Sequence, residues 1–363
     1  MKVSIGTKIQ KGPWGGGNLF AINLSRYLEE KGHQVVYNLK DDDIDIILLT
    51  DPRADSEAAS FDHYDIIYYK NFINPNTVVF HRINECDERK GTNYVNKYYI
   101  KANKVADATI FVSSWLMKIY NEQGLVANNQ KVILAGADKN IFNTNSRVMW
   151  NKTSKLKIVT HHWGADWNKG FEIYKKLDEK LGEKKFSEFF EFTFIGNLPD
   201  GFKFNNASHI NPLVGVELAR KLKENNIYLT ASVNEPSGNH HIEAAQCGLP
   251  LIYINSGGIP EYCEGYGVSF DSSNFFNKLL ELKKNYQDYF NKINNYPNNS
   301  IKMSSEFLSF FEEIKSRKND ISASKISKSN LILQSIYKFI IVVRKLILTN
   351  RIKSIITHAI FKK

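Results

Sequence analysis

Cysteine and long hydrophobic runs are scarce in this sequence. The three cysteines, Cys86, Cys247 and Cys263, lack metal-ligand spacing, and their odd number argues against a disulfide framework. Residues 1–17 contain no apolar run long enough for a signal peptide. The apolar run Phe339 to Val343 is far shorter than the 20 or so residues of a membrane-spanning helix. These absences favour a protein of the reducing cytoplasm.

The length and composition indicate folded domains. The chain has 363 residues, which is long for one core and suits two domains of average size. Hydrophobic residues make up 42% and aromatic residues 13% of the chain, enough to build packed cores. Such a composition excludes a largely disordered protein.

The positive charge is concentrated at the C-terminal end. The chain carries a net charge of +10, yet no Asp or Glu follows Asp320, whereas nine Lys and Arg residues do. The remaining body is therefore close to neutral. A basic chain usually suggests nucleic-acid binding. Because this charge lies only in the tail, we expect no nucleic-acid partner.

Strand and helix patterns alternate along the chain and restart after residue 150. Short apolar runs such as 44–49, 77–80 and 108–112 are separated by helical stretches, and 65–69 is a weaker strand candidate. This alternation predicts parallel, doubly wound α/β sheets. We expect two Rossmann-like domains, residues 1–148 and 149–318, followed by a basic helical tail at 319–363. Ligands of such sheets bind where the strands end, here across a cleft between the domains.

The segment from Ala231 to Glu261 contains the densest cluster of candidate site residues. It holds two strands, each of which ends in a polar loop. The first loop carries Glu235 and opens a helix near His240, and the free amides at a helix start favour an anion such as pyrophosphate. Glu243 is then placed to accept hydrogen bonds from sugar hydroxyls. The first turn would be lined by Gly238, Asn239 and His240, and the glycines Gly257 and Gly258 would let the second loop approach a ligand.

This segment resembles the family 4 glycosyltransferases of the GT-B architecture. Their signature is Glu, seven residues, Glu, then an Ala-x-x-x-Gly-x-Pro run and a Gly-Gly-x-Pro-Glu loop. The matching residues are Glu235, Glu243, Ala244, Gly248, Pro250, Gly257, Gly258, Pro260 and Glu261. The resemblance implies that Glu235 contacts the transferred sugar, that Glu243 contacts the nucleotide ribose, and that anomeric configuration is retained.

Three other segments are similar to this family. Gly15, Gly16 and Gly17 match its first loop, which approaches donor phosphates or acceptor. We expect Asn18 to be the N-cap of the helix that follows. His81, after the predicted strand 77–80, matches a histidine close to the reacting sugar.

The third similar segment matches the family's diphosphate-clamping loop. Lys169 and Gly170 match its Lys-Gly pair, and His162 of the same loop would line the donor site. The family usually has an arginine where this chain has Gly164. Either a histidine or an arginine of the N-terminal domain compensates, or turnover is slower. The loop after His81 is rich in polar residues and is expected to form a polar wall of the cleft; they are Arg82, Asn84, Asp87 and Arg89.

Each of these residues also has a structural explanation. Glu243 could be a solvated first-turn carboxylate stabilised by the helix dipole. The glycine run could be a flexible turn, His81 a structural histidine, and Lys169 a surface lysine at a helix start. No metal is implied, because no Asp-x-Asp pair lies at a strand end near the predicted site.

The tail pattern is that of a basic amphipathic helix. Ile336, Ile340, Val343 and Ile347 recur at helical spacing among lysines and arginines. Such a helix would lie on an anionic membrane surface. The alternative is a terminal helix that packs on the body, a role that Ser305 to Ile314 could also fill.

The sequence therefore predicts a retaining glycosyltransferase of the cytoplasm, in peripheral contact with the inner face of the plasma membrane through its tail. It would use a nucleoside-diphosphate sugar and a saccharide or lipid-linked acceptor, without cofactor or metal, in bacterial surface polysaccharide or glycolipid synthesis. Two alternatives remain open at this point. One is an epimerase that acts on a nucleotide sugar, and the other is a catalytically silent nucleotide-sugar-binding subunit.

Overall fold

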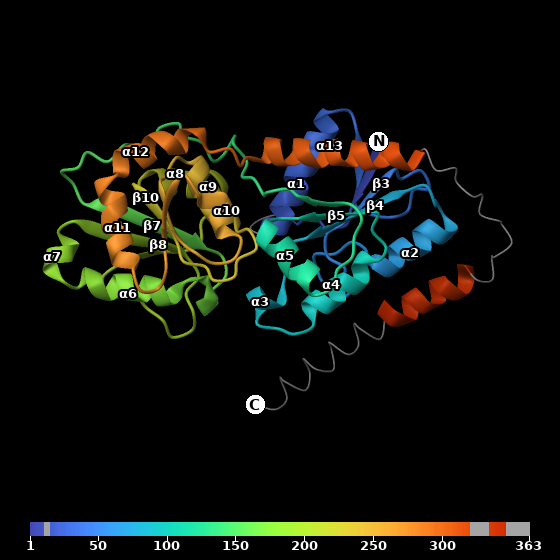
Figure 1. The fold of residues 1–363 in the computed structure, drawn as a ribbon, viewed down its shortest axis with the longest axis horizontal. Coiled ribbons are helices and arrows are strands. Elements are labelled where there is room, and N and C mark those ends of the chain that lie inside the picture. The colour runs from blue at the N-terminus through green and yellow to red at the C-terminus, as the bar shows by residue number, and fades with distance from the viewer. Residues whose placement is uncertain (11–14, 320–333, 346–363) are drawn as a thin grey trace, which may run out of the picture.

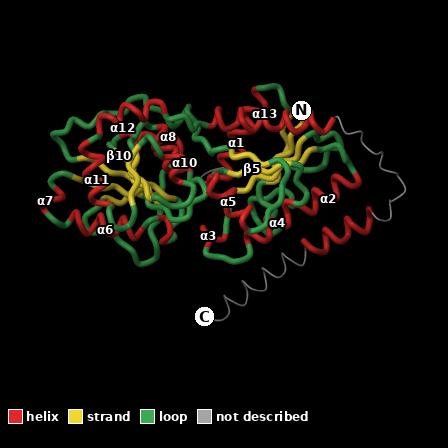
Figure 2. The backbone as a smooth tube through the Cα atoms, in the orientation of Figure 1, coloured by secondary structure: helices red, strands yellow, loops and turns green. Residues whose placement is uncertain are grey.

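The computed structural model describes residues 1–10, 15–319 and 334–345, which form two α/β domains side by side (Figure 1). In each domain a parallel sheet lies between layers of helices (Figure 2). The predicted fold class, two doubly wound domains, is confirmed. Both sheets have six strands, and inner strands such as Ile46–Leu49 are buried at every residue, which explains their uninterrupted apolar runs.

The first sheet has the strand order β2-β1-β3-β4-β5-β6. Its strands are β1 (Lys2–Ile5), β2 (Gln34–Val36), β3 (Ile46–Leu49), β4 (Val78–Ile83), β5 (Ala108–Phe111) and β6 (Gln130–Val132). The helices between them are α1 (Gly15–Glu30), α2 (His63–Phe72), α3 (Asp87–Lys90), α4 (Val95–Asn103) and α5 (Ser114–Glu122). The strand order reverses beside β1, so α1 begins at the point where such sheets bind ligands.

The second sheet has the order β12-β11-β10-β7-β8-β9. Its strands are β7 (Leu156–His162), β8 (Phe190–Gly196), β9 (Ser208–Ile210), β10 (Ile227–Thr230), β11 (Leu251–Ile254) and β12 (Gly267–Phe270). Its helices are α6 (Phe171–Leu181), α7 (Lys184–Ser187), α8 (Gly215–Lys223), α9 (Asn239–Gln246), α10 (Ile259–Cys263), α11 (Phe275–Lys284) and α12 (Tyr286–Lys292), with short 3-10 turns at Trp167–Lys169 and Ile293–Asn295. Here the order reverses beside β7, and α9 follows the adjacent strand β10.

The last labelled helix, α13 (Ser300–Asn319), returns to the first domain and covers its sheet together with α1 (Figure 1). The ring of Phe311 lies 4.6 Å from that of Phe80 in β4, and Phe307 lies 5.1 Å from Phe20 in α1. The predicted second domain ends at 318 and so includes this helix, whereas packing assigns it to the first domain. Helix α13 packs on the first domain because its aromatic side chains complete the core of that domain.

Two local expectations were wrong. Residues 65–69, a strand candidate, belong to α2, because the Asp62 carboxylate accepts bonds from the amides of Tyr64 and Asp65 and starts a helix there. Helix α1 begins at Gly15 instead of Asn18. The Asn18 side chain bonds both backbone groups of Gln10, each at 2.9 Å, and so fixes the chain before the helix instead of capping it.

The position of α13 can be tested by truncating one of its rings. Phe311→Ala removes a fully buried ring, so we expect the unfolding free energy to fall by about 3–5 kcal/mol. Ile301→Ala, in the same helix but 41% exposed, should change it by less than about 1 kcal/mol. Urea unfolding followed by circular dichroism measures both, and equal effects would contradict the packing of α13 on the first domain.

Candidate active site

The polar loops of both domains meet where their strands end. From the first domain, the loops after β4 and β5 supply Arg89 and Ser113. From the second, the loops after β10 and β11 supply Glu235 and Gly258. Of the residues predicted from the Glu-x7-Glu segment and its second loop, Glu235 and Gly258 therefore lie at the junction between the domains.

The carboxylate of Glu235 is bound by cations from both domains. Its Oε2 atom lies 3.0 Å from Nζ of Lys169 and 3.1 Å from Nη2 of Arg89, and it accepts a bond from Ser232 Oγ. Burial alone would raise the pKa of Glu235, but the positive charges of Lys169 and Arg89 outweigh it and the pKa is lowered. Glu235 is therefore an ionised carboxylate inside the domain junction.

Glycine allows the second loop to approach Glu235. A Cβ atom at Gly257, whose φ is +65°, would lie 2.5 Å from the Glu235 carbonyl oxygen. The Gly258 amide donates to that same oxygen at 2.8 Å, and a Cβ at Gly258 would lie 2.3 Å from the Pro236 oxygen. Side chains at either position would separate the two loops, so this glycine pair sets where Glu235 lies.

Glu243 lies on α9 and pairs with a histidine that sequence reasoning passed over. Its Oε2 atom lies 2.9 Å from Nε2 of His161, and both side chains are buried. We predicted His162 for this site, but its Nε2 lies 2.7 Å from the Tyr174 hydroxyl in α6. Strand β7 runs to residue 162, and side chains alternate along a strand. His161 and His162 therefore point to opposite faces of the sheet, and this alternation could have identified His161 as the partner of Glu243.

The remaining histidines of the segment are buried, whereas we expected polar lining at the first turn. His240 Nε2 lies 2.8 Å from the Thr230 hydroxyl, and His241 is fully buried. Burial lowers the pKa of His241 to about 3 and that of His240 well below its usual value, so both are neutral at pH 7. A Cβ at Gly238 would lie 2.8 Å from the His240 ring. Within the described residues no cluster of His, Cys, Asp or Glu could hold a metal ion.

The first turns of α1 and α9 face each other across the junction. A Cβ at Gly16 would lie 3.0 to 3.2 Å from the side-chain amide of Asn239, the first residue of α9. Gly15, Gly16 and Gly17 form the first turn of α1 and are exposed, so the predicted glycine loop is in fact a helix start. Two helix N-termini meeting at one place attract an anion.

Lys169 and Arg89 approach Glu235 from opposite domains. The Gly164 backbone leaves room for Lys169, and a Cβ at Gly164 would lie 3.3 Å from Lys169 Cε. Arg89 lies in α3 of the first domain and contacts the same oxygen of Glu235 as Lys169 does. An arginine of the N-terminal domain thus lies beside the same carboxylate as Lys169.

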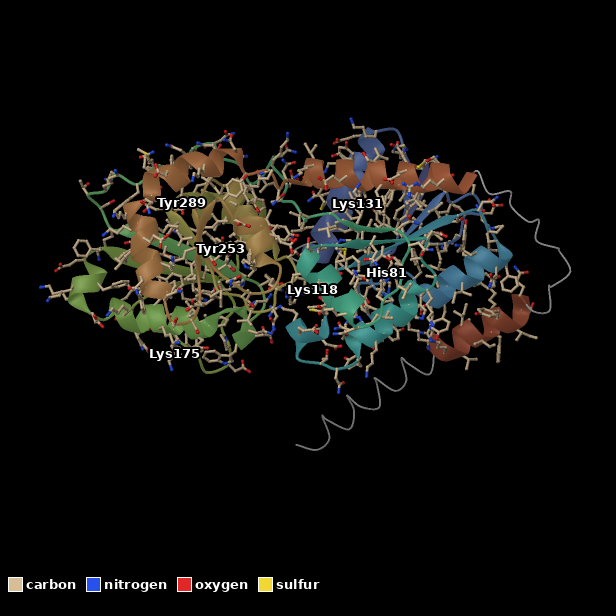
Figure 3. The ribbon with its side chains drawn as sticks, viewed as in Figure 1. His81, Lys118, Lys131, Lys175, Tyr253 and Tyr289 are labelled. Atoms are coloured by element: carbon tan, nitrogen blue, oxygen red, sulfur yellow. The ribbon has the colours of Figure 1, made fainter. Side chains whose placement is uncertain are left out.

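His81 is not at the junction, in contrast to our prediction. Strand β4 continues to Ile83, so His81 lies within the strand instead of after it, and it is fully buried in the first domain (Figure 3). Its Nδ1 atom lies 2.8 Å from Asn103 Oδ1 and its ring stacks on Tyr99. Burial lowers the pKa of His81 to about 4. The ring is therefore neutral, and its Nε2 atom is buried without a hydrogen-bond partner among the described residues.

Direct hydrogen bonds hold the two domains in this arrangement. The Glu261 carboxylate accepts bonds from the amides of Ser114 and Trp115, both at 2.8 Å, and so caps helix α5 of the opposite domain. The Asn168 side chain donates to the Arg89 carbonyl at 2.9 Å. Glu261, the last residue of the Gly-Gly-x-Pro-Glu loop, thus fixes the orientation of the domains.

Comparison with solved structures agrees with this geometry. HepE of Anabaena, solved with UDP and glucose, aligns with a TM-score of 0.63 and 14% identity over 86% of this chain and 100% of its own. The catalytic domain of starch synthase IV from Arabidopsis thaliana, bound to ADP and acarbose, gives 0.63 and 11% over 87% and 99%. A glycosyltransferase of Rickettsia africae gives 0.60 and 13% over 86% and 98%. The chain has the GT-B fold.

Sequence comparison gives a more limited result. No protein-family model matches the chain. Over 166 residues, 44% of the chain, it is 25% identical to sulfoquinovosyl transferase SQD2 of Arabidopsis thaliana. The match spans 32% of that protein, about a third of its length.

The buried histidines predict a dependence of stability on pH. Their pKa values are lowered in the folded state, so below about pH 6.5 the unfolded chain binds protons that the folded chain does not. Stability should therefore fall as the pH drops from about 6.5 to 4. Each such group contributes up to about 1.4 kcal/mol per pH unit.

His241→Phe removes one of these groups while keeping a ring, so its loss of stability between pH 6 and pH 4.5 should be shallower than that of the unmodified protein. His209→Gln, at an exposed histidine, is the control and should keep the original slope. Urea midpoints at several pH values measure both slopes. An unchanged slope in His241→Phe would show that this histidine is not held neutral.

Proposed function

We propose that the protein is a glycosyltransferase that moves a sugar from a nucleoside-diphosphate donor to a hydroxyl acceptor. The observation that carries this proposal is the set of groups around Glu235. A carboxylate, Lys169 and Arg89 meet at the junction of two domains, and two helix N-termini meet at the same junction. Neighbours of this fold were solved with UDP and glucose or with ADP. A nucleotide sugar has an anionic diphosphate and a hydroxyl-rich sugar, which these groups can bind.

Each group has a distinct task in this proposal. Lys169, Arg89 and the helix N-termini neutralise the charge that develops on the departing diphosphate, so no metal is needed. Glu235 binds the transferred sugar, and Glu243, held by His161, binds the ribose. Their resemblance to family 4 supports transfer with retention of configuration.

Because Arg89 comes from the first domain, neutralisation of the diphosphate charge depends in this proposal on closure of the two domains. Arg89 belongs to α3 of the first domain, whereas Lys169 and Glu235 belong to the second. The two cations reach one carboxylate only in the arrangement held by Glu261 and Asn168. We therefore propose that the clamp is complete only when the domains are closed, which would limit reaction with water.

The C-terminal tail contains a helix that docks on the first domain. Residues 334–345 form a helix, here called the tail helix, on the outside of α2 (Figure 1). Arg344 pairs with Asp62 at 2.8 Å and Lys345 with Asp65 at 2.7 Å. Residues 346–363, including Ile347 of the predicted pattern, lie outside the described residues. The tail helix thus packs on the body of the protein, which is the alternative that the sequence left open.

The tail helix also leaves an apolar surface uncovered. Phe339 is 69% exposed, and Ile336, Ile340 and Val342 are about half exposed. No described helix is long and apolar enough to cross a membrane. We propose that this surface rests on the cytoplasmic face of the plasma membrane. A lipid-linked acceptor, or a saccharide made there for a surface polysaccharide or glycolipid, would then be within reach.

The activity is tested by product analysis with a panel of nucleotide sugars. We expect free nucleotide and a glycosylated acceptor, whereas an altered donor sugar would indicate an epimerase. Glu235→Gln and Glu243→Gln should each lower the rate by roughly 100-fold or more. Glu264→Gln, at an exposed carboxylate in the next loop, is the control and should leave the rate unchanged. Full activity in both site variants would refute the assignment of the site.

Membrane contact is tested by sedimentation with vesicles of anionic phospholipid. Phe339→Glu with Ile340→Glu places two charges on the exposed surface of the tail helix and should abolish binding. The matched control, Val126→Glu, changes an exposed apolar residue of the body and should bind as before. Equal sedimentation of all variants would contradict the membrane role of the tail helix.

A further inference from the structure

Arg82 is a buried cation that the proposed mechanism does not use. It lies in β4, one residue before the strand ends, and is only 5% exposed. Burial lowers the pKa of Arg82 to about 10, which still leaves the guanidinium charged at neutral pH. A charged group in this position is costly unless something nearby compensates it.

Among the described residues, none forms a hydrogen bond or an ion pair with the Arg82 guanidinium. Within the described residues the guanidinium makes a cation–π contact with the ring of Phe20 in α1, whose centroid lies 4.0 Å from the guanidinium carbon. A contact of this kind contributes about 2 kcal/mol at most, less than the several kcal/mol that burial of an ion costs. The other cations of the junction differ, because Lys169 and Arg89 share the carboxylate of Glu235.

The position of Arg82 places this charge at the edge of the sheet that faces the second domain. Side chains alternate along β4, so Arg82 shares a face with Phe80 under α1 and α13, opposite to His81. In the neighbouring strand, the residues just after β5 contact the second domain: the Val112 carbonyl accepts a bond from Tyr262, and Ser113 lies against Gly258. Tyr262 in turn influences the pKa of Arg82.

We propose that Arg82 binds an anionic group of the acceptor, a phosphate or a carboxylate, and thereby selects acidic acceptors. This inference rests on the proposed transferase function and adds the chemical class of the second substrate. The donor diphosphate is already served by Lys169, Arg89 and the helix starts. Arg82, by contrast, belongs to the sheet of the first domain. Its fork of N–H donors matches both phosphate and carboxylate oxygens.

Removal of the Arg82 charge should not lower the stability of the protein, although the residue is buried. Arg82→Met keeps an unbranched apolar side chain at this position but removes the uncompensated charge, so the unliganded protein should be as stable as the original or more so. Arg82→Lys keeps the charge and should retain part of the anion binding. A merely structural arginine would give the opposite result, with a lower melting temperature in Arg82→Met.

Thermal shift with defined probes tests the binding site. UDP or ADP, whichever raises the melting temperature, is added to occupy the donor site, followed by inorganic phosphate, glucuronate or glucose at constant ionic strength. The original protein should be stabilised by phosphate, which would indicate a phosphorylated acceptor, or by glucuronate, which would indicate an acidic sugar. Glucose should not stabilise it through Arg82. Arg82→Met should lose the anion shift but keep the nucleotide shift.

The control is Arg220→Met, at a strongly exposed arginine, which should respond to anions as the original protein does. Equal anion shifts in Arg82→Met and the original protein, or no anion shift at all, would overturn the proposal. Loss of the nucleotide shift in Arg82→Met would also overturn it, because Arg82 would then serve the donor. If neither nucleotide binds but the Arg82-dependent anion shift remains, the transferase proposal fails while the anion site stands.

Discussion

The structure depends on the compensation of one buried negative charge, the carboxylate of Glu235. An isolated carboxylate at a domain junction would be expensive to bury, and here Lys169 and Arg89 supply the opposite charge from two different domains. The same pair of cations is well suited to a diphosphate.

Much of the surrounding architecture brings these three groups together. Gly257 and Gly258 let the second loop come within hydrogen-bond distance of the Glu235 backbone, and Glu261 caps a helix of the opposite domain. The return of α13 to the first domain gives the chain a second connection between the domains. These contacts all act on the distance and angle between the two sheets, and so on the distance from Arg89 to Glu235.

The sequence predicted what local patterns determine. Alternating strands and helices gave the two parallel sheets, and the spacing of glutamates and glycines gave the loops around Glu235. It could not predict Arg89 as the partner of Lys169, because that contact depends on how two domains face each other. The sequence placed His81 after the strand, whereas β4 continues three residues beyond Phe80, the last residue of the apolar run. Residues 65–69 are helical because of the cap at Asp62. Helix α13 packs on the first domain because of aromatic residues that are distant in the sequence.

The central claim is that cations from both domains serve one anion site. The most direct test is a double-mutant cycle on nucleoside diphosphate affinity, measured calorimetrically with UDP and ADP for Lys169→Met, Arg89→Met and the double variant. Loss of one charge-assisted bond of 1.5–3 kcal/mol predicts roughly tenfold to hundredfold weaker binding in each single variant. Because the two cations share one anion, we expect their effects to be non-additive. Wild-type affinity in Arg89→Met would contradict the account.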